Sequence, residues 1–423
     1  WDEDGGFLWI ATEAGISRFN GIDFVNYTRN NTSFIESERM RFSITNANGE
    51  MRVVDLDGNI IGIKENIRKG HRFAISDIAV NEFINQCGYP FAQSKGIAQG
   101  ELISVERIHN VIPEIDKNKF QDPNYTLGGD IRASVSFHKF RTLWFNLGSQ
   151  CNIECKNCYI KSSPRADHFV YLKPNDILPY LDEIDSISKN RIEIGFTGGE
   201  PYLNPDAIEL SEIVLQRGHK LLILTNAMRP MMRPKVQKGL LTLKQKYGNK
   251  LTLRVSLDHY TEEGHDKERG KGSFRRALEG LNWLDENSFL INIAGRSEFA
   301  ESEYDAIQGY HELIKRNKLK IDLDNKEVLT LFPEMDENID VPEISKNCWS
   351  ILNVQPRDMM CATSRMVVRR KNETSASVLA CTLLWDNKQF ETGKTLKQSM
   401  KPVQLNHPHC SKFCVLGGAS CSG

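Results

Sequence analysis

The sequence predicts an α/β protein whose central sheet is built from parallel strands. From residue 142 onward, six short apolar runs of strand length alternate with amphipathic stretches of helix length. Such alternation usually gives parallel neighbours that are joined by right-handed crossovers. Six units are too few for a closed eight-stranded barrel, so we expect either a partial barrel or an open sheet.

The elements of this series can be placed in order along the chain. The expected strands are apolar runs at residues 142–148, 192–198, 220–226, 251–258, 289–295 and 327–333. Helical periodicity lies between them at residues 174–189, 234–248 and 273–287. Asn175 and Ser273 are the expected N-caps of the first and third helices. Ligands of parallel sheets gather beyond the carboxyl ends of the strands, so functional residues are expected there.

The N-terminal region has a different, β-rich pattern. Residues 2–28 contain short alternating strands with glycine turns and resemble one repeat of the sensor-type β-propellers of two-component regulators. One repeat cannot bury its own faces, so residues 1–30 are interpreted as a propeller-repeat-like fragment. Residues 31–138 form a second region of unknown role, with an expected hairpin at 49–63 and an expected helix at 75–86.

Composition limits the partners that we expect. The formal net charge is −1, with 40% hydrophobic and 26% charged residues, which is typical of a globular protein without a global attraction to nucleic acid or acidic membranes. No apolar run reaches the roughly 18 residues that span a bilayer, so we expect no membrane association and a cytoplasmic location. Because the chain begins at Trp1, we expect it to be a fragment or a processed product.

Three cysteines, Cys151, Cys155 and Cys158, follow directly after the first expected strand. Thiolates are soft ligands that favour zinc or iron–sulfur clusters, and clustering of this kind indicates metal rather than disulfides. A structural zinc site needs a fourth ligand, but no second Cys-x2-Cys pair occurs within the next hundred residues. His168 is the nearest histidine, and a single histidine in a polar loop is more often a surface residue. Either the fourth ligand is remote, or one coordination position is left open.

The Cys-x3-Cys-x2-Cys spacing and the segment "TGGEP" at residues 197–201 resemble the radical S-adenosylmethionine (radical SAM) enzymes. This resemblance implies a partial (β/α)6 barrel at residues 139–335, in which the three thiolates bind three irons of a [4Fe–4S] cluster. The fourth iron is then left for the amino and carboxylate groups of S-adenosylmethionine. One electron from a reductant such as flavodoxin or ferredoxin would cleave the sulfonium to a 5′-deoxyadenosyl radical, which abstracts hydrogen from the substrate.

The resemblance also implies an S-adenosylmethionine site on the following strand ends. The implied contacts are Tyr159 beside the cluster, Gly198, Gly199, Glu200 and Pro201 around the methionine ammonium, and Ser256 and Asp258 near the ribose hydroxyls and the methionine carboxylate, together with Asn226 and Arg296. Arg296 could instead pair with a substrate carboxylate, or it could be a solvated arginine at the rim of the barrel. The segment "HDKERGKGSF" (265–274) is similar to the peptide-modifying branch of the family.

A second group of cysteines lies in the C-terminal extension, residues 336–423. Cys361 and Cys381 flank an expected hairpin, and Cys410, Cys414 and Cys421 follow it. The segment resembles the SPASM and twitch extensions of radical SAM enzymes, which implies an auxiliary [4Fe–4S] cluster; zinc and disulfides remain the alternatives. Cys348 is interpreted as a buried small side chain rather than as a sixth ligand.

These patterns lead to a functional expectation. We expect a radical SAM iron–sulfur oxidoreductase or maturase that modifies a peptide or protein. One alternative is a radical SAM enzyme of small-molecule or cofactor biosynthesis, and another is a non-catalytic metal-binding sensor. The Gly-Gly-Glu-Pro motif argues against the sensor, because a sensor has no use for a site that receives the ammonium of S-adenosylmethionine.

Overall fold

The structure is a computed structural model of the chain. It describes residues 115–416, apart from 297–302, 326, 333–337, 339 and 353, together with six strands between residues 8 and 64. The chain divides into two compact units. The first contains residues 1–117 with 338–342, and the second contains residues 118–337 with 343–423.

The described strands of the first unit form two small antiparallel sheets. The first sheet contains β1 (Leu8–Thr12), β2 (Gly15–Phe19) and β3 (Phe24–Tyr27), and the second contains β4 (Arg41–Thr45), β5 (Glu50–Val54) and β6 (Ile60–Lys64). The strands expected within residues 2–28 and the hairpin expected at 49–63 are therefore confirmed. The helix expected at residues 75–86 lies outside the described residues. The likeness to a propeller repeat stays a prediction.

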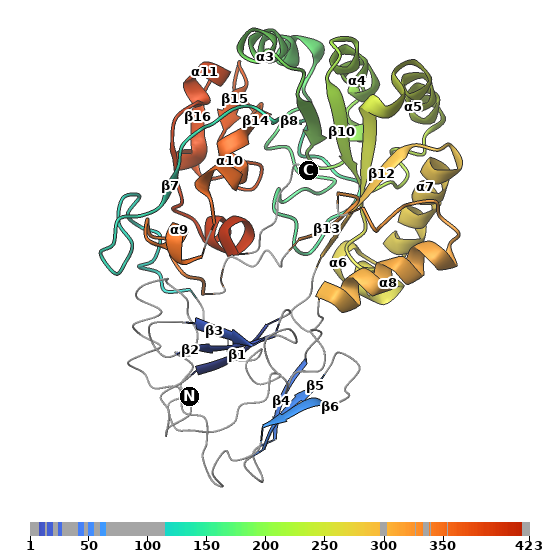
Figure 1. Cartoon of the computed structure of the whole chain (residues 1–423). Helices are drawn as coiled ribbons and strands as arrows, with labels where there is room; N and C mark the ends of the chain where they lie inside the picture. Colours follow the sequence, from blue (N-terminus) through green and yellow to red (C-terminus); the bar gives the residue numbers. More distant parts are fainter. Residues whose placement is uncertain are drawn as a thin grey trace. The chain divides into compact units, whose positions relative to one another are not determined.

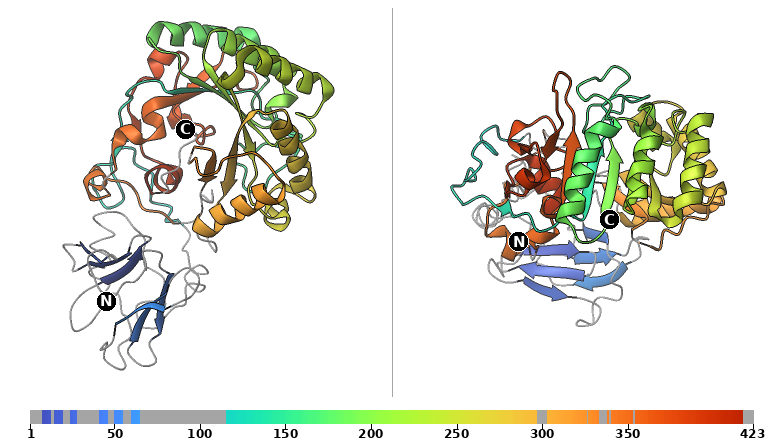
Figure 2. Two further views of the ribbon diagram at one scale, coloured as in Figure 1. Left: turned by 45° about the vertical axis from the view of Figure 1, so that its right-hand side comes forward. Right: turned by 90° about the horizontal axis from the view of Figure 1, so that it is seen from above.

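The second unit is an α/β fold around one nine-stranded sheet (Figure 1). The strand order is β13 (Leu329–Phe332), β12 (Leu290–Arg296), β11 (Leu251–Ser256), β10 (Lys220–Thr225), β9 (Glu193–Thr197), β8 (Thr142–Asn146), β14 (Ser364–Val368), β15 (Ser377–Leu379) and β16 (Glu391–Gly393). All six strands expected from the sequence are present and mutually parallel. The sheet curves without closing, since β13 and β16 are its two edges, and helices cover its outer face (Figure 2). The predicted incomplete barrel is confirmed.

The C-terminal hairpin extends this sheet. The sequence predicted antiparallel β14 and β15, but it did not predict that β14 would pair in parallel with β8, with Met366 opposite Trp144. Residues more than two hundred positions apart thus become neighbours, and the cysteine-rich segment belongs to the same compact unit as the barrel strands. A functional boundary at residues 335 and 336 stays a prediction.

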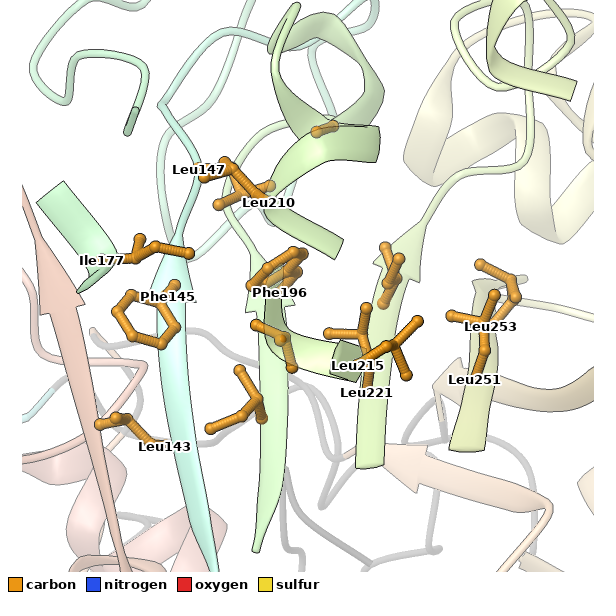
Figure 3. Close-up of a cluster of buried hydrophobic side chains, with 14 of the residues drawn as sticks. Leu143, Phe145, Leu147, Ile177, Phe196, Leu210, Leu215, Leu221, Leu251 and Leu253 are labelled. Atoms are coloured by element: carbon orange, nitrogen blue, oxygen red, sulfur yellow. The ribbon is translucent and has the colours of Figure 1, made fainter. Parts of the chain in front are cut away.

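The core lies on both faces of the sheet because alternate strand residues point to opposite sides. Leu143 and Phe145 of β8 pack with Phe196 and Leu221 of the neighbouring strands (Figure 3). The helix layer adds buried side chains such as Leu210 to this cluster. The strand residues that alternate with these point to the inner face, where they form a second cluster that includes Trp144, Leu222 and Met366. Burial on both faces explains why these strands read as continuous apolar runs rather than as alternating patterns.

The outer helices are α3 (Pro174–Ile187), α4 (Ala207–Gln216), α5 (Pro234–Tyr247), α7 (Ser273–Glu286) and α8 (Glu303–Arg316). Shorter elements are α6 (Glu262–Arg269), α9 (Cys348–Ile351), α10 (Met360–Thr363), α11 (Leu396–Ser399) and the pair β7 (Ser134–Val135) and β17 (Val403–Gln404). No described helix is long and apolar enough to cross a bilayer.

The two expected N-caps are wrong by one or two residues. Lys173 is the N-cap of α3, because Pro174 occupies the first helical position that proline favours. Gly272 is the N-cap of α7, where the carboxylate of Asp266 accepts hydrogen bonds from the backbone N–H groups of Gly272 and Phe274 at 2.5 and 2.9 Å. A carboxylate from the preceding helix thus replaces the expected serine cap.

Candidate functional site

The three cysteines of the first motif lie together at the carboxyl end of β8. Cys151 is buried, while Cys155 and Cys158 are half-buried, and all three line one cavity. Two nitrogen atoms face their sulfur atoms: Asn226 Nδ2 lies 3.7 Å from Cys151 Sγ, and the backbone N of Ser162 lies 3.4 Å from Cys158 Sγ. Hydrogen bonds to sulfur are a usual feature of iron–sulfur ligation, so the surroundings fit thiolate ligands.

Most of the residues that the sequence singled out line the same cavity. Nine of them do so: Cys151, Cys155, Cys158, Tyr159, Gly198, Gly199, Asn226, Ser256 and Arg296. They come from the cysteine loop and from the ends of β9, β10, β11 and β12, as expected for a parallel sheet. Glu200, Pro201 and Asp258 are buried directly behind this wall, and Pro201 begins a short 3₁₀ helix, Pro201–Leu203.

The two glycines hold the cysteine loop against the loop that follows β9. The backbone N–H groups of Gly199 and Glu200 donate to the carbonyl oxygens of Gly148 and Gln150, both at 2.9 Å. A Cβ atom on Gly199 would lie 2.0 Å from the Gln150 carbonyl oxygen, and Gly198 adopts φ +132°. Only glycine permits this approach and this backbone conformation, so the pair positions the loop that carries Cys151.

Replacing Gly199 with alanine should therefore displace the cysteine loop. We expect anaerobically reconstituted Gly199→Ala protein to lose most of the iron bound by the first three cysteines, because the added Cβ meets backbone rather than a movable side chain. Iron and sulfide per chain are the measurement. Gly128→Ala is the control, since the nearest atom to its Cβ lies 3.8 Å away, and it should retain full iron content. Equal iron in the two variants would contradict this role.

Glu200 is an internal anchor between the strand ends. Its carboxylate is 2% exposed and accepts hydrogen bonds from Thr225 Oγ1 at 2.9 Å, from the Asn226 N–H at 2.9 Å and from the Tyr202 N–H at 3.2 Å. Burial raises its pKa to about 7, although these hydrogen bonds oppose the shift. The carboxylate thus fixes Asn226, which lines the cavity, and its direct contact with a ligand ammonium stays a prediction.

The charge of Glu200 should make ligand affinity depend on pH. Deprotonation above a pKa of about 7 supplies the negative charge that favours a bound ammonium, so affinity for S-adenosylmethionine should rise between about pH 6 and 8. Glu200→Gln keeps the shape but removes the charge, and we expect at least a tenfold loss of affinity, about 1.4 kcal/mol, without that pH dependence. Calorimetric titration measures it, with unchanged core iron as the control. An unaltered pH profile would exclude this role.

Asp258 pairs with two arginines at the cavity wall. Its carboxylate accepts from Arg269 Nε at 2.8 Å and from Arg269 Nη2 at 2.9 Å, and Arg296 Nε lies 3.5 Å away. Burial alone would raise the pKa of Asp258, but the two guanidinium groups lower it to about 2. Asp258 is therefore occupied by these arginines, and its predicted proximity to the ribose or carboxylate of S-adenosylmethionine is not tested by this geometry.

Sequence reasoning missed Arg269, although this residue lies within the segment "HDKERGKGSF". Its side chain is 12% exposed and lines the cavity beside the thiols. The signal that could have found it is its place in α6, directly after the β11 loop that carries Asp258. The sequence alone could not show the pairing, because Arg269 and Asp258 are neighbours only once α6 folds back.

Arg296 presents a donor into the cavity. Its side chain is only 14% exposed, so the alternative of a solvated rim arginine is wrong. Nη2 donates to the Asn157 carbonyl at 2.9 Å, whereas Nη1 is buried and has no hydrogen-bond partner among the described residues. Ser162 also lines the cavity, and its buried hydroxyl likewise has no hydrogen-bond partner among the described residues. Buried donors of this kind fit a bound carboxylate, which S-adenosylmethionine has.

The C-terminal cysteines form a second group. Cys361 lies in α10, Cys381 follows β15, and Cys410 begins a π-helix, Cys410–Leu416; all three are buried. Burial raises the pKa of Cys361 to about 12, and the charge of Cys381 raises it further. Burial likewise raises the pKa of Cys410, with added contributions from Cys381 and Cys361. The three thiols therefore lie within electrostatic reach of one another.

The remaining cysteines are placed less closely. Cys414 is half-buried on the π-helix and packs against the inner-face cluster of apolar side chains, to which Cys361, Cys381 and Cys410 belong. Cys421 lies outside the described residues. Cys348 is buried in α9, 3.5 Å from Ser345 Oγ. None of the eight described cysteines forms a disulfide. Among the described residues, no group of three or more His, Cys, Asp or Glu side chains is placed so that it could hold a metal ion.

Trp385 connects the two cysteine groups. Its indole Nε1 donates to the carbonyl of Tyr159, the residue after Cys158, at 2.6 Å, and its ring stacks on His168 at 4.3 Å. Trp385 itself follows Cys381 by four residues, so the two thiol-bearing segments are in direct contact. His168, the histidine nearest to the first motif, packs against this ring, and burial lowers its pKa.

Comparison with known proteins agrees with this arrangement. The sequence profile of the Radical SAM superfamily matches residues 145–303. The antilisterial bacteriocin subtilosin biosynthesis protein AlbA of Bacillus subtilis (strain 168) is 32% identical over 152 residues, 36% of this chain and 32% of AlbA. The AdoMet-dependent heme synthase of Methanosarcina barkeri (strain Fusaro / DSM 804) is 27% identical over 157 residues, 36% of this chain and 41% of that enzyme. This chain thus matches less than half of the length of either relative.

Among solved structures, the crystal structure of Streptococcus suis SuiB bound to precursor peptide SuiA aligns with 86% of this chain and 87% of SuiB. The sequence identity is 15% and the TM-score is 0.45.

Proposed function

We propose that this chain, whose residues 145–303 match the sequence profile of the Radical SAM superfamily, cleaves S-adenosylmethionine reductively and uses the resulting radical to modify a peptide. One arrangement carries the proposal. Three thiols, the Gly-Gly backbone, Asn226, Ser256 and two arginines line a single cavity at the carboxyl ends of the barrel strands. That cavity offers both soft ligands for iron and polar groups for an amino acid.

The residues divide the work at this site. Cys151, Cys155 and Cys158 would hold a [4Fe–4S] cluster, which supplies one-electron reduction of the sulfonium when bound. Gly199 and Glu200 hold together the loops that would flank the ligand ammonium. The carboxylate of S-adenosylmethionine would accept a hydrogen bond from Arg296 Nη1, which has no partner among the described residues.

Arg269 and Asp258 support that carboxylate site from behind. Their ion pair is buried, so it holds Arg296 in place at the end of β12 without exposing charge to water. Tyr159 lines the cavity, and Asn157 supports Arg296: its carbonyl accepts from Arg296 Nη2, and its side chain donates to Glu268 Oε2 at 2.9 Å.

We also propose that the second thiol group holds an auxiliary [4Fe–4S] cluster. Cys361, Cys381 and Cys410 are the principal ligands, with Cys414 or Cys421 as the fourth. Their shared apolar surroundings and mutual electrostatic reach support it. A structural zinc ion is the alternative, and measurement of the zinc and iron content of the protein will distinguish the two.

A peptide is the substrate class that we propose. The segment "HDKERGKGSF" and the C-terminal thiol group both support it, and the relative AlbA is a biosynthesis protein of the bacteriocin subtilosin. The similarity to a heme synthase supports a second candidate, radical chemistry on a small molecule. A reductant of the flavodoxin or ferredoxin type would supply the electron, and the cytoplasm is the compartment that suits reduced thiols.

Anaerobic turnover tests the activity. Reconstituted protein, supplied with dithionite and S-adenosylmethionine, should form 5′-deoxyadenosine and methionine without added substrate, because uncoupled cleavage requires only the cluster and the cofactor. Liquid chromatography with mass spectrometry measures both products. Protein that carries the core iron yet yields no 5′-deoxyadenosine would contradict the proposal. The same assay with candidate peptides and porphyrins, scored for stimulated cleavage, separates the two substrate classes.

A further inference from the structure

Arg365 is a buried guanidinium on the strand that bears the second thiol group. It lies in β14, four residues after Cys361, and is 0% exposed. No carboxylate of the described residues forms an ion pair with it. Its hydrogen bonds go to backbone carbonyls only: those of Cys361 at 2.5 Å, Ser364 at 2.7 Å, Ser399 at 2.9 Å and Lys401 at 3.3 Å.

A cation in this position is energetically costly unless a negative charge lies near. Burying an isolated charge costs far more than neutral hydrogen bonds return, so buried arginines are normally paired. The ring of Phe137, 4.6 Å from the guanidinium carbon, adds only a weak attraction. Two thiols of the second group, Cys361 and Cys381, lie within electrostatic reach of Arg365, and they carry negative charge only when they are deprotonated, as in a metal complex.

The apo protein therefore leaves two unfavourable features side by side. Cys361, Cys381 and Cys410 are buried thiols, and none of them forms a disulfide with another described cysteine. Burial lowers the pKa of Arg365 to about 10, so the guanidinium still carries its charge at neutral pH. A metal group held by several thiolates has a net negative charge, so its presence would balance the charge of the guanidinium.

We propose that Arg365 is the fixed counter-charge of an anionic metal–thiolate group at Cys361, Cys381 and Cys410. This inference rests on the proposed auxiliary site and makes Arg365 a positioning residue, since it touches the Cys361 backbone rather than the metal. A nearby buried cation stabilises the more negative, reduced state of a cluster. By the same attraction, it favours binding of a metal by the thiolates.

The test uses the full chain with the first three cysteines changed to alanine, so that only the second site binds metal. Cobalt(II), read by its thiolate charge-transfer absorption, reports affinity, and a redox titration after iron and sulfide reconstitution reports the midpoint potential. Arg365→Gln should weaken cobalt(II) binding by about ten- to a hundredfold and shift the potential to more negative values. Arg365→Lys retains the charge and should restore most of both properties.

Two further variants make the result specific. Arg369→Gln removes an arginine adjoining the same strand, but one whose guanidinium pairs with Asp176 at 2.9 Å, and it should leave affinity and potential unchanged. Phe137→Glu places a carboxylate at the half-buried ring over Arg365, so it should shift the potential in the negative direction while keeping the guanidinium. This variant decides the matter if Arg365→Gln does not fold.

The outcomes are distinguishable. Cobalt(II) affinity and potential that are unchanged in both Arg365→Gln and Phe137→Glu would overturn the role of Arg365 and leave the auxiliary site intact. An Arg365→Lys variant as impaired as Arg365→Gln would also overturn it, because charge would not be the cause. Failure of the parent variant to bind either metal would remove the auxiliary site and this inference together. The 5′-deoxyadenosine assay of the unaltered protein would still judge the core activity separately.

Discussion

Protein in which Cys151, Cys155 or Cys158 is replaced by alanine will release no 5′-deoxyadenosine from S-adenosylmethionine. The three thiols converge on one cavity, and two thiolates cannot hold a cluster that must keep one iron open for the cofactor. We expect the loss to be complete within detection rather than partial. Full product yield from any of the three variants would contradict the assignment of this cavity as the site of S-adenosylmethionine cleavage.

Iron content then separates the two thiol groups. Unaltered, reconstituted protein should carry about eight irons per chain, and the triple alanine variant about four, because each [4Fe–4S] cluster contributes four. Cys348→Ala is the control: this thiol is buried but packs in α9 beside Ser345, so the variant should keep both the iron and the activity. A triple variant that binds one zinc ion and no iron would replace the auxiliary cluster with a structural zinc site.

The second large effect is expected at the ion pair between Arg269 and Asp258. Arg269→Met leaves the Asp258 carboxylate 5% exposed, with only Arg296 at 3.5 Å to balance it. Breaking a buried pair from one side costs about 3–5 kcal/mol, so we expect the free energy of unfolding to fall by that amount. Affinity for S-adenosylmethionine should also fall, because Arg296 would turn toward Asp258 and away from the cavity.

Denaturant unfolding and calorimetric titration measure these two effects. Arg275→Met is the control from the same pair of helices, since its partner Glu262 and its own side chain are largely exposed. Exposed pairs contribute about 0–1 kcal/mol, so this variant should retain nearly full stability and affinity. If the two arginine variants were equally stable, the buried pair would not be the support of the site.

The sequence by itself determined the repeating strand–helix order and the position of the chemistry. Apolar runs on β8 to β13 are readable because a parallel sheet buries both faces of its strands, and that property is local. Cys151, Cys155 and Cys158, together with Gly198 and Gly199, lie at strand ends, and strand ends of one sheet meet at one edge. The convergence of these residues followed from topology alone.

Tertiary structure decided the contacts that depend on long-range packing. The pairing of β14 with β8, the burial of Arg365 beside Cys361 and the contact of Trp385 with Tyr159 join segments far apart in the sequence. Each depends on how side chains pack in three dimensions, and no periodic pattern encodes such partners. The Arg269–Asp258 pair is nearer in sequence, yet it too forms only because α6 folds back onto the end of β11. The partner of a charged side chain depends on the tertiary fold, whereas hydrophobic periodicity is a local property that can be read from the sequence.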